Sequence, residues 1–435
     1  MTLYMAETED GLLTAFEYSR DLFEAATVRR MLEHFERVLA EVVAAPERPL
    51  SEIHLLTEEE GRELERRRQP RAPRDRRAKE APAYLAPRDE LEFGLARIMG
   101  NVLGVERVGV RDSFFDLGGH SLMAVRLALT IKREFGRELP IGDLLQGPTV
   151  EQLAGLLRQG GVAPKRSALV PIRPGGTRRP FFCVHPVGGS VLCYAALAQH
   201  LGPEQPFYAF QLPALEDVPS PPTIEGLAAH YLRELRAIQP QGPYRLGGWS
   251  MGGVIAFEMA RLLSEEGEGV SLLALIDSYV PRGVGGREGF DGHDLLRMFA
   301  RDMEGVSGRG FEFPHEDARR LPLDEALGLL LERARASEAV PEGLGLPELR
   351  ELFRRYSTSL SALLAYEPRA YAGKLTLFKS GAADGGDAAH GWEPYAASSE
   401  VLEIEGDHYS IVNGPPVKVL AARLGEMLNG RGDHG

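Results

Sequence analysis

The stretch Gly248-Trp249-Ser250-Met251-Gly252-Gly253 limits what this chain can fold into more than any other part of the sequence. It follows the apolar residues 244–248, which predict a strand, and it precedes the apolar run 254–263, which predicts a helix. A G-x-S-x-G sequence in that place forms a sharp, strained turn that leaves no room for larger side chains at the glycine positions. The turn lifts the serine hydroxyl clear of the backbone. The sequence therefore predicts alternating strands and helices, with Ser250 as a nucleophile.

Strand and helix patterns alternate through the C-terminal part of the chain. Apolar runs that predict strands lie at 181–185, 207–211, 244–248, 270–276, 374–379 and 401–404. This alternation predicts a largely parallel sheet with helices on both faces, and together with the serine turn it indicates an α/β-hydrolase over residues 169–430. The interval 282–366 is too long for a loop and carries helical patterns, so we expect an inserted helical lid there.

A serine hydroxyl needs a base within hydrogen-bond reach, and the chain order in this fold is Ser, then Asp or Glu, then His. Asp277 ends the apolar run 270–276, where a carboxylate can face the serine turn, and we assign it as the acid. Asp407 is an alternative, but it adjoins the candidate histidine, and immediate neighbours rarely point at each other. Asp384 and Asp387 lie in a Gly-rich stretch that favours exposure to solvent.

The candidate base is His408, in Gly406-Asp407-His408-Tyr409, because it follows the last predicted strand and a loop there can return over the sheet. The other histidines after Asp277 lie in the insert, in a polar loop or in the tail, and we expect them on the surface: His293, His315, His390 and His434.

A second loop completes the predicted site. Val184-His185-Pro186-Val187-Gly188-Gly189 closes the first strong strand and opens a helix, where an α/β-hydrolase supplies a backbone amide to the oxyanion. We therefore expect the amides of Val187 and Met251 to form the oxyanion hole, each contributing roughly 3 to 4 kcal/mol to transition-state stabilisation. His185 itself is expected to be structural.

Upstream of residue 169 the chain divides into three further pieces. Residues 1–60 alternate in strand fashion and then show one apolar helical stripe over 24–45, which predicts an α+β fragment. Residues 61–84 are rich in Arg and Pro and predict a solvated linker. Residues 85–160 carry three helical patterns, and the second of these begins at Ser121. The Gly118-Gly119 pair before it permits a sharp turn that leaves Ser121 at a helix N-cap.

Length and charge restrict the class of protein. The 435 residues exceed what one core usually organises, so several domains are expected, and the formal net charge of -13 argues against a nucleic-acid partner. No apolar run has the length of a membrane helix and no signal-peptide pattern opens the chain, so we expect a cytoplasmic protein without a membrane partner. Cys183 and Cys193 fall in an apolar segment and are expected to be reduced. No metal is expected.

These motifs resemble those of one enzyme family. The run 242–253, with Phe182-Cys183-Val184-His185-Pro186 before it and Gly406-Asp407-His408-Tyr409 after it, resembles the terminal thioesterase domain of nonribosomal peptide synthetases. The run 112–122 is similar to the attachment motif of a peptidyl carrier domain, a small four-helix-type unit, with Ser121 at the position that receives 4′-phosphopantetheine.

The first residues extend the resemblance. Residues 1–60, with Tyr18-Ser19-Arg20-Asp21-Leu22-Phe23 and Leu55-Leu56-Thr57-Glu58, resemble the end of a condensation domain, but a His-His-x-x-x-Asp-Gly motif is missing, so we expect no catalysis there. In such synthetases an adenylation domain stands between the condensation and carrier domains, whereas here the linker passes straight to the carrier. We therefore expect that the chain does not activate an amino acid by itself.

The resemblance implies a chain that terminates nonribosomal peptide synthesis. A peptidyl thioester on Ser121 would pass to Ser250, and water or a nucleophile within the peptide would release it as a free acid or a macrocycle. The implied partners are upstream synthetase modules and a phosphopantetheinyl transferase. An editing thioesterase is one alternative, and a carrier and docking scaffold without catalysis is another.

Overall fold

The computed structural model divides into two compact units, residues 1–81 and 82–435, and each is described by itself. The described residues are 2–8, 11–17, 25–44, 84–115, 117, 119, 121–137, 144, 148–158, 167–213, 221–281, 290–341, 343–381 and 389–430. Within these ranges, no helix is both long enough and apolar enough to cross a membrane. The linker predicted over 61–84 lies almost wholly outside the described residues.

The first unit contains a hairpin and one helix. Strands β1 (Thr2–Thr8) and β2 (Gly11–Glu17) pair antiparallel, with Thr2 opposite Glu17 and Thr8 opposite Gly11. Helix α1 (Ala25–Ala44) follows, and its apolar stripe was visible in the sequence. The predicted hairpin and helix are confirmed.

The part of the second unit that precedes residue 160 is helical. Helices α3 (Glu90–Leu103), α4 (Ser121–Phe135) and α6 (Val150–Arg158) bury a shared apolar core. Its buried side chains include Leu95 and Ile98 of α3, Leu127 and Ile131 of α4, Leu153 of α6, and Phe114 from the segment between α3 and α4. The three predicted helices are confirmed. The fourth helix that the family resemblance implies is not among the helices described between residues 84 and 158.

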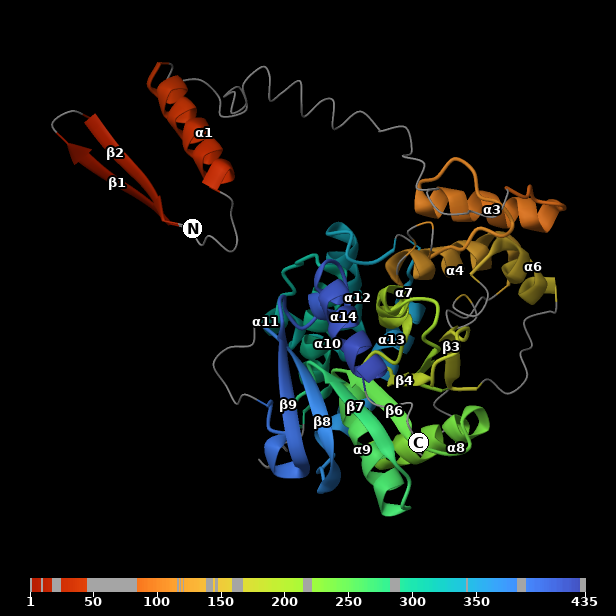
Figure 1. Cartoon of the computed structure of the whole chain (residues 1–435). Coiled ribbons are helices and arrows are strands. Elements are labelled where there is room, and N and C mark those ends of the chain that lie inside the picture. The colour runs from red at the N-terminus through yellow and green to blue at the C-terminus, as the bar shows by residue number, and fades with distance from the viewer. Residues whose placement is uncertain are drawn as a thin grey trace. The chain divides into compact units, whose positions relative to one another are not determined.

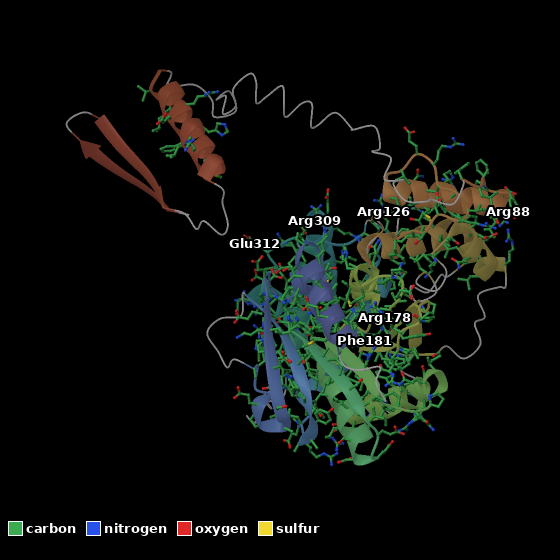
Figure 2. The ribbon with its side chains drawn as sticks, in the orientation of Figure 1. Arg88, Arg126, Arg178, Phe181, Arg309 and Glu312 are labelled. Carbon is green, nitrogen blue, oxygen red and sulfur yellow. The ribbon has the colours of Figure 1, made fainter. Side chains whose placement is uncertain are left out.

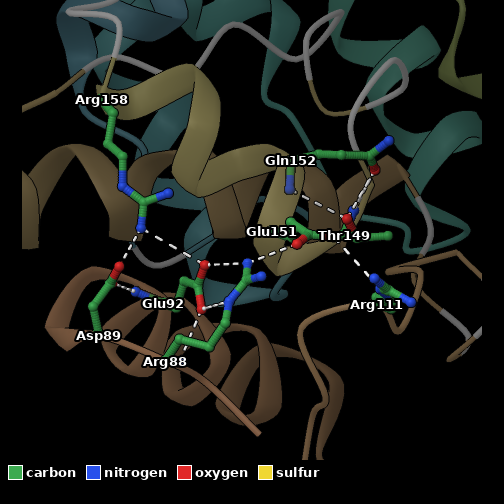
Figure 3. Close-up of polar contacts among 8 residues, drawn as sticks. All are labelled: Arg88, Asp89, Glu92, Arg111, Thr149, Glu151, Gln152 and Arg158. Carbon is green, nitrogen blue, oxygen red and sulfur yellow. Dashed lines mark hydrogen bonds and ion pairs between the residues drawn. The ribbon is translucent and has the colours of Figure 1, made fainter. Parts of the chain in front are cut away.

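A buried carboxylate joins the first and last of these helices. Glu92 of α3 is 1% exposed, and both of its oxygens accept hydrogen bonds from Arg88, at 2.6 and 3.0 Å (Figure 3). Arg88 also contacts Glu151 of α6 at 2.7 Å, and Arg158 of α6 contacts Glu92 at 3.6 Å. The hydrogen bond from Arg88 lowers the pKa of Glu92 to about 2, so the buried carboxylate stays ionised and paired.

A seven-stranded sheet organises the remainder of the second unit, in the order β3-β5-β4-β6-β7-β8-β9 (Figure 1). Its strands are β3 (Leu169–Arg173), β4 (Phe181–Val184), β5 (Phe207–Phe210), β6 (Tyr244–Trp249), β7 (Val270–Ile276), β8 (Tyr371–Ser380) and β9 (Ala396–Ile404). All neighbours pair in parallel except β3, which runs antiparallel to β5 at the edge. The six predicted strands are confirmed, and the sequence reading missed β3.

Helices cover both faces of this sheet. Helices α8 (Ile224–Ile238) and α9 (Met251–Glu265) pack on one face, and α7 (Ala195–Leu201) and α14 (Pro416–Gly430) pack on the other. Successive side chains of strand β4 point to opposite faces, as a sheet covered on both faces requires. Phe182 and Val184 pack in the core beneath α8 and α9, whereas Phe181 and Cys183 pack in the core beneath α7 and α14; Figure 2 labels Phe181. Both cysteines are free.

The predicted helical insertion lies between β7 and β8. Its helices are α10 (Gly292–Ser307), α11 (His315–Ala318), α12 (Leu323–Ala336) and α13 (Leu346–Leu364). The 3-10 helices η2 (Leu192–Tyr194), η4 (Glu393–Tyr395) and η5 (Ser410–Val412) complete the described elements. The structure thus bears out helices over most of 282–366. That they act as a lid remains a prediction.

Candidate active site

The serine turn has the strained form that its sequence predicts. Ser250 joins β6 to α9 with φ 57° and ψ -127°, a conformation that side chains rarely adopt. A Cβ on Gly248 would lie 2.2 Å from the Gly252 carbonyl, and one on Gly252 would lie 2.1 Å from the Val184 oxygen. Both contacts are with backbone and cannot relax. Only glycine therefore fits at these two positions.

Asp277 directly follows β7 and is fully buried. Its Oδ2 accepts a hydrogen bond from His408 Nδ1 at 2.7 Å, and its Oδ1 accepts one from the Ser380 amide at 2.8 Å. Burial alone would raise the pKa of this carboxyl. Hydrogen bonds from His390, His408 and Ser380 outweigh it and hold the pKa well below its usual range. Asp277 is therefore an anion that can orient an imidazole.

His408 lies in the loop after β9, and the serine turn helps to hold it. The indole Nε1 of Trp249 donates to the His408 carbonyl at 2.9 Å, and the two rings lie 5.2 Å apart. The His408 side chain is 29% exposed. Because Nδ1 faces Asp277, the proton sits on that nitrogen, and Nε2 is left to accept a proton from a reacting group.

The rejected acids can be compared with Asp277. Oδ1 of Asp407 accepts the amides of Tyr409 at 2.9 Å and Ser410 at 2.8 Å, so this carboxylate closes the turn that carries His408. It is held by the backbone rather than by the imidazole. Asp384 and Asp387 lie outside the described residues.

The loop after β4 is shaped by a neutral histidine. His185 is buried, with Nδ1 2.7 Å from the Pro186 carbonyl and Nε2 2.8 Å from the Tyr231 hydroxyl. Burial lowers the pKa of His185 to about 4, so the ring donates from Nδ1 and accepts from Tyr231. The expected structural role fits this geometry. Val187 lies two residues further on, within the turn closed by the Gly189 amide to Pro186 at 2.9 Å.

Met251, the second predicted oxyanion donor, is the first residue of α9. Amides in the first turn of a helix have no partner within it, and they favour negative charge. Across the described ranges, neither the Val187 amide nor the Met251 amide donates a hydrogen bond that would occupy it. The two amides follow the carboxyl ends of β4 and β6, which are neighbouring parallel strands.

One histidine expected on the surface belongs to the site instead. His390 is 3% exposed, and its Nε2 lies 3.3 Å from Asp277 Oδ1, so the surface prediction is wrong for this residue. His315 is exposed as expected, His293 is partly buried with Nε2 2.9 Å from the Leu321 carbonyl, and His434 lies outside the described residues. The available signal was the place of His390 after β8, the strand next to that of Asp277.

The insertion reaches the histidine loop through α10. Asp302 accepts a hydrogen bond from the Tyr409 hydroxyl at 3.1 Å, and a Cβ on Gly305 would lie 2.0 Å from the Tyr409 ring. Burial raises the pKa of Asp302 to about 6. The residue after the candidate base therefore packs directly on the first helix of the insertion.

The predicted attachment residue, Ser121, is the first residue of α4. The turn before it is close-packed, because the Gly119 amide donates to the Phe114 carbonyl at 2.9 Å and a Cβ on Gly119 would lie 2.3 Å from the Phe114 ring. A serine at the start of a fifteen-residue helix suits a phosphodiester, since helix amides and the helix dipole favour phosphate. The described residues around it therefore fit a 4′-phosphopantetheine group. They hold no group of side chains suited to a metal ion.

A parallel sheet with a strained serine turn, and with an Asp–His contact at the same edge, defines the α/β-hydrolase class. Residues 179–420 match the thioesterase domain family, residues 94–157 match the phosphopantetheine attachment site family, and residues 1–65 match the condensation domain family. The first match covers more than half of the chain, so the chain belongs to the thioesterase domain family. Its carrier domain is of the kind to which 4′-phosphopantetheine is covalently attached.

The relatives are nonribosomal peptide synthetases. A dimodular nonribosomal peptide synthase of Bacillus subtilis is 33% identical over 81% of this chain and 15% of its own length. The chondramide synthase of Chondromyces crocatus is 31% identical over 78% of this chain and 9% of its own. A solved holo four-domain synthetase bound to AMP and glycine is 33% identical, with a TM-score of 0.57 over 80% of this chain and 27% of its own. The chain thus spans a small part of the relatives it matches.

Proposed function

We propose that this chain ends nonribosomal peptide synthesis, by carrying a peptidyl group at Ser121 and releasing it through an acyl ester on Ser250. The observation that carries the proposal is the 2.7 Å contact between Asp277 and His408, which is tied to the serine turn by the bond from Trp249 to the His408 carbonyl. The 4′-phosphopantetheine group, once attached, supplies a thiol that holds the acyl group as a thioester.

In the first step His408 Nε2 takes the proton of the Ser250 hydroxyl as its oxygen bonds to the thioester carbonyl carbon. Asp277 keeps the imidazole in the required tautomer and stabilises its cation. The carbon–sulfur bond then breaks, and His408 returns the proton to the departing sulfur. The amides of Val187 and Met251 stabilise the oxyanion that forms in between.

In the second step Ser250 becomes the leaving group, and His408 again acts first as base and then as acid. His408 removes a proton from water, or from an amine or hydroxyl of the same peptide, and this nucleophile attacks the Ser250 ester. Its proton then passes through His408 to the serine oxygen, which restores Ser250. An internal nucleophile held near the ester gains a large effective molarity, and helices α10 to α13 would act as the lid that excludes water.

The domain matches also suggest partners. A carrier and a condensation fragment indicate a peptidyl thioester delivered by upstream synthetase modules, and the carrier requires a phosphopantetheinyl transferase for its modification. A carrier within the same chain favours terminal release over editing, because an editing enzyme serves carriers on other chains.

Labelling with a serine-directed fluorophosphonate tests the proposal. We expect one label in the tryptic peptide 246–261, whose only serine is Ser250, and no label in the Ser250→Ala variant. Ser264→Ala changes a serine near the far end of the same helix, and it should label like the wild type. A folded wild-type chain that stays unlabelled would instead mark a scaffold without catalysis.

A further inference from the structure

Two histidines contact Asp277, the proposed acid of the site. Besides His408 on Oδ2, the buried His390 approaches Oδ1 of Asp277 with Nε2 at 3.3 Å, beside the Ser380 amide at 2.8 Å. The carboxylate thus has donors on both oxygens. The mechanism proposed above uses His408 and leaves His390 without a role.

His390 is held firmly in this place. Its carbonyl accepts the Val280 amide at 3.0 Å, and the nearby Trp392 donates from its indole to the Ser278 carbonyl at 2.8 Å. Its ring stacks on Tyr279 at 3.8 Å with an interplanar angle of 21°. The loop after β8 is therefore bonded to the loop after β7 on both sides of the His390–Asp277 contact.

The backbone at both ends of the contact is unusual. Asp277 has φ 41° and His390 has φ 53°, and both values lie in the left-handed region that favours glycine. Such conformations persist only where the surroundings over-determine them, and they gather at functional sites. Here the two residues face each other.

We propose that His390 is a positioning residue, which donates from Nε2 to Asp277 Oδ1 and thereby fixes the plane of the carboxylate toward His408. This inference rests on the proposed function, because it assigns His390 a part in activating the base of that site. With Ser380 and His390 on one oxygen, rotation of the carboxylate would break two hydrogen bonds. The other oxygen is thereby kept in line with His408 Nδ1.

The His390–Asp277 contact also affects His408, the proposed base. A donor on Oδ1 draws negative charge away from the oxygen that faces His408, so the imidazolium of His408 gains less from Asp277. His390 itself does not touch the reacting atoms and acts only through Asp277.

Other titratable groups face the two histidines, and the test leaves all of them in place. Around His408 they are Asp277, Tyr279, Asp302, Asp407 and Tyr409. Among the residues that the structure describes, those around His390 are Asp277 and Tyr279. A change in pH dependence caused by substituting His390 alone is therefore read through Asp277.

Steady-state turnover of hexanoyl-pantetheine by the whole chain, measured against pH, tests the inference. His390→Leu removes the donor, and we expect kcat to fall about tenfold, the usual effect of one hydrogen bond to a charged group, with KM unchanged. The acid limb of kcat should move to higher pH, because Asp277 without that donor presents more negative charge to His408. His390→Gln places an amide nitrogen near the position of Nε2, and it should restore both kcat and the acid limb.

Trp392→Phe is the matched control, because it removes a hydrogen bond of the same loop without touching Asp277. It should leave the acid limb in place, even if the variant is less stable. If His390→Leu has the wild-type kcat and acid limb, or if Trp392→Phe moves the limb equally, the inference is wrong and the contact is only structural. Fluorophosphonate labelling separates the two proposals: an unlabelled wild type overturns both, whereas a labelled wild type with an unaffected His390→Leu variant overturns this one alone.

Discussion

Two helices of the chain begin at or just after a serine to which we assign a function, and the two helix starts are built differently. Ser121 is the first helical residue of α4, after a turn packed against Phe114. Ser250 is the cap before α9, with φ 57°, and its amide is bonded to the Ile276 carbonyl of the neighbouring strand at 3.0 Å. One serine starts a helix, whereas the other is fixed to a sheet in a strained conformation.

The two helix starts differ because the proposed roles of the two serines make different structural demands. A residue that another enzyme modifies requires access and a helix start that favours phosphate. In its proposed role as a nucleophile, Ser250 requires partners at fixed distances, and a rigid sheet is the frame that can hold them. Val187, Ser250, Asp277, His390 and His408 follow β4, β6, β7, β8 and β9, which are consecutive parallel neighbours. The site is therefore assembled from the carboxyl ends of five adjacent strands.

Removing the strained serine or its base should have the largest effect. We expect Ser250→Ala and His408→Ala each to lower turnover of an acyl-pantetheine thioester on the order of 10⁶-fold, because the pair acts as one unit. The double variant should resemble the worse single one. Single-turnover kinetics on the folded proteins measure this, and losses that multiply would show two independent contributions instead of one unit.

The next largest effect should distinguish the two carboxylates near His408. Asp277→Asn keeps the shape but favours the wrong imidazole tautomer, and it should lower kcat on the order of 10⁴-fold. Asp407→Asn keeps an oxygen for the Tyr409 and Ser410 amides, and it should leave kcat near that of the wild type. Measuring kcat for both variants decides between them, since a crippled Asp407→Asn would move the role of acid to Asp407.

The sequence was sufficient to predict the position of a candidate site residue wherever that residue lies close to the end of its strand. Asp277 comes immediately after β7 and His408 shortly after β9, so the rule that parallel strands end at one edge placed both near Ser250. The need for glycine at 248 was equally visible, because a Cβ there meets the backbone of Gly252 in the same motif, whereas the clash at Gly252 is with the Val184 oxygen of the neighbouring strand. Local sequence motifs and the topology of the sheet were thus enough to predict most of the candidate site.

The sequence did not predict the position of residues that are brought to the site, or into the sheet, by tertiary contacts. His390 lies well beyond Ser380, the end of β8, in a polar stretch that predicts exposure. Among the described residues, the bond from the Val280 amide and the stacking on Tyr279 hold it beside Asp277. Strand β3 was missed because Pro171 interrupts a short edge strand, where proline is tolerated. Both misses depend on tertiary contacts that no periodicity records.

The smallest effect on turnover is expected at the other helix start. Ser121→Ala should abolish modification by a phosphopantetheinyl transferase and coenzyme A, because the hydroxyl that becomes the phosphodiester is gone. Hydrolysis of a free acyl-pantetheine thioester should be unchanged, since that substrate does not depend on the carrier. The tryptic peptide 112–126 contains Ser113 as well as Ser121, so Ser113→Ala is the matched control and should still gain one arm by mass spectrometry. A gain of mass in Ser121→Ala would refute the carrier assignment. A fall in hydrolysis of the free thioester would instead show that the start of α4 acts in the thioesterase reaction, and the contrast between the two serines would no longer hold.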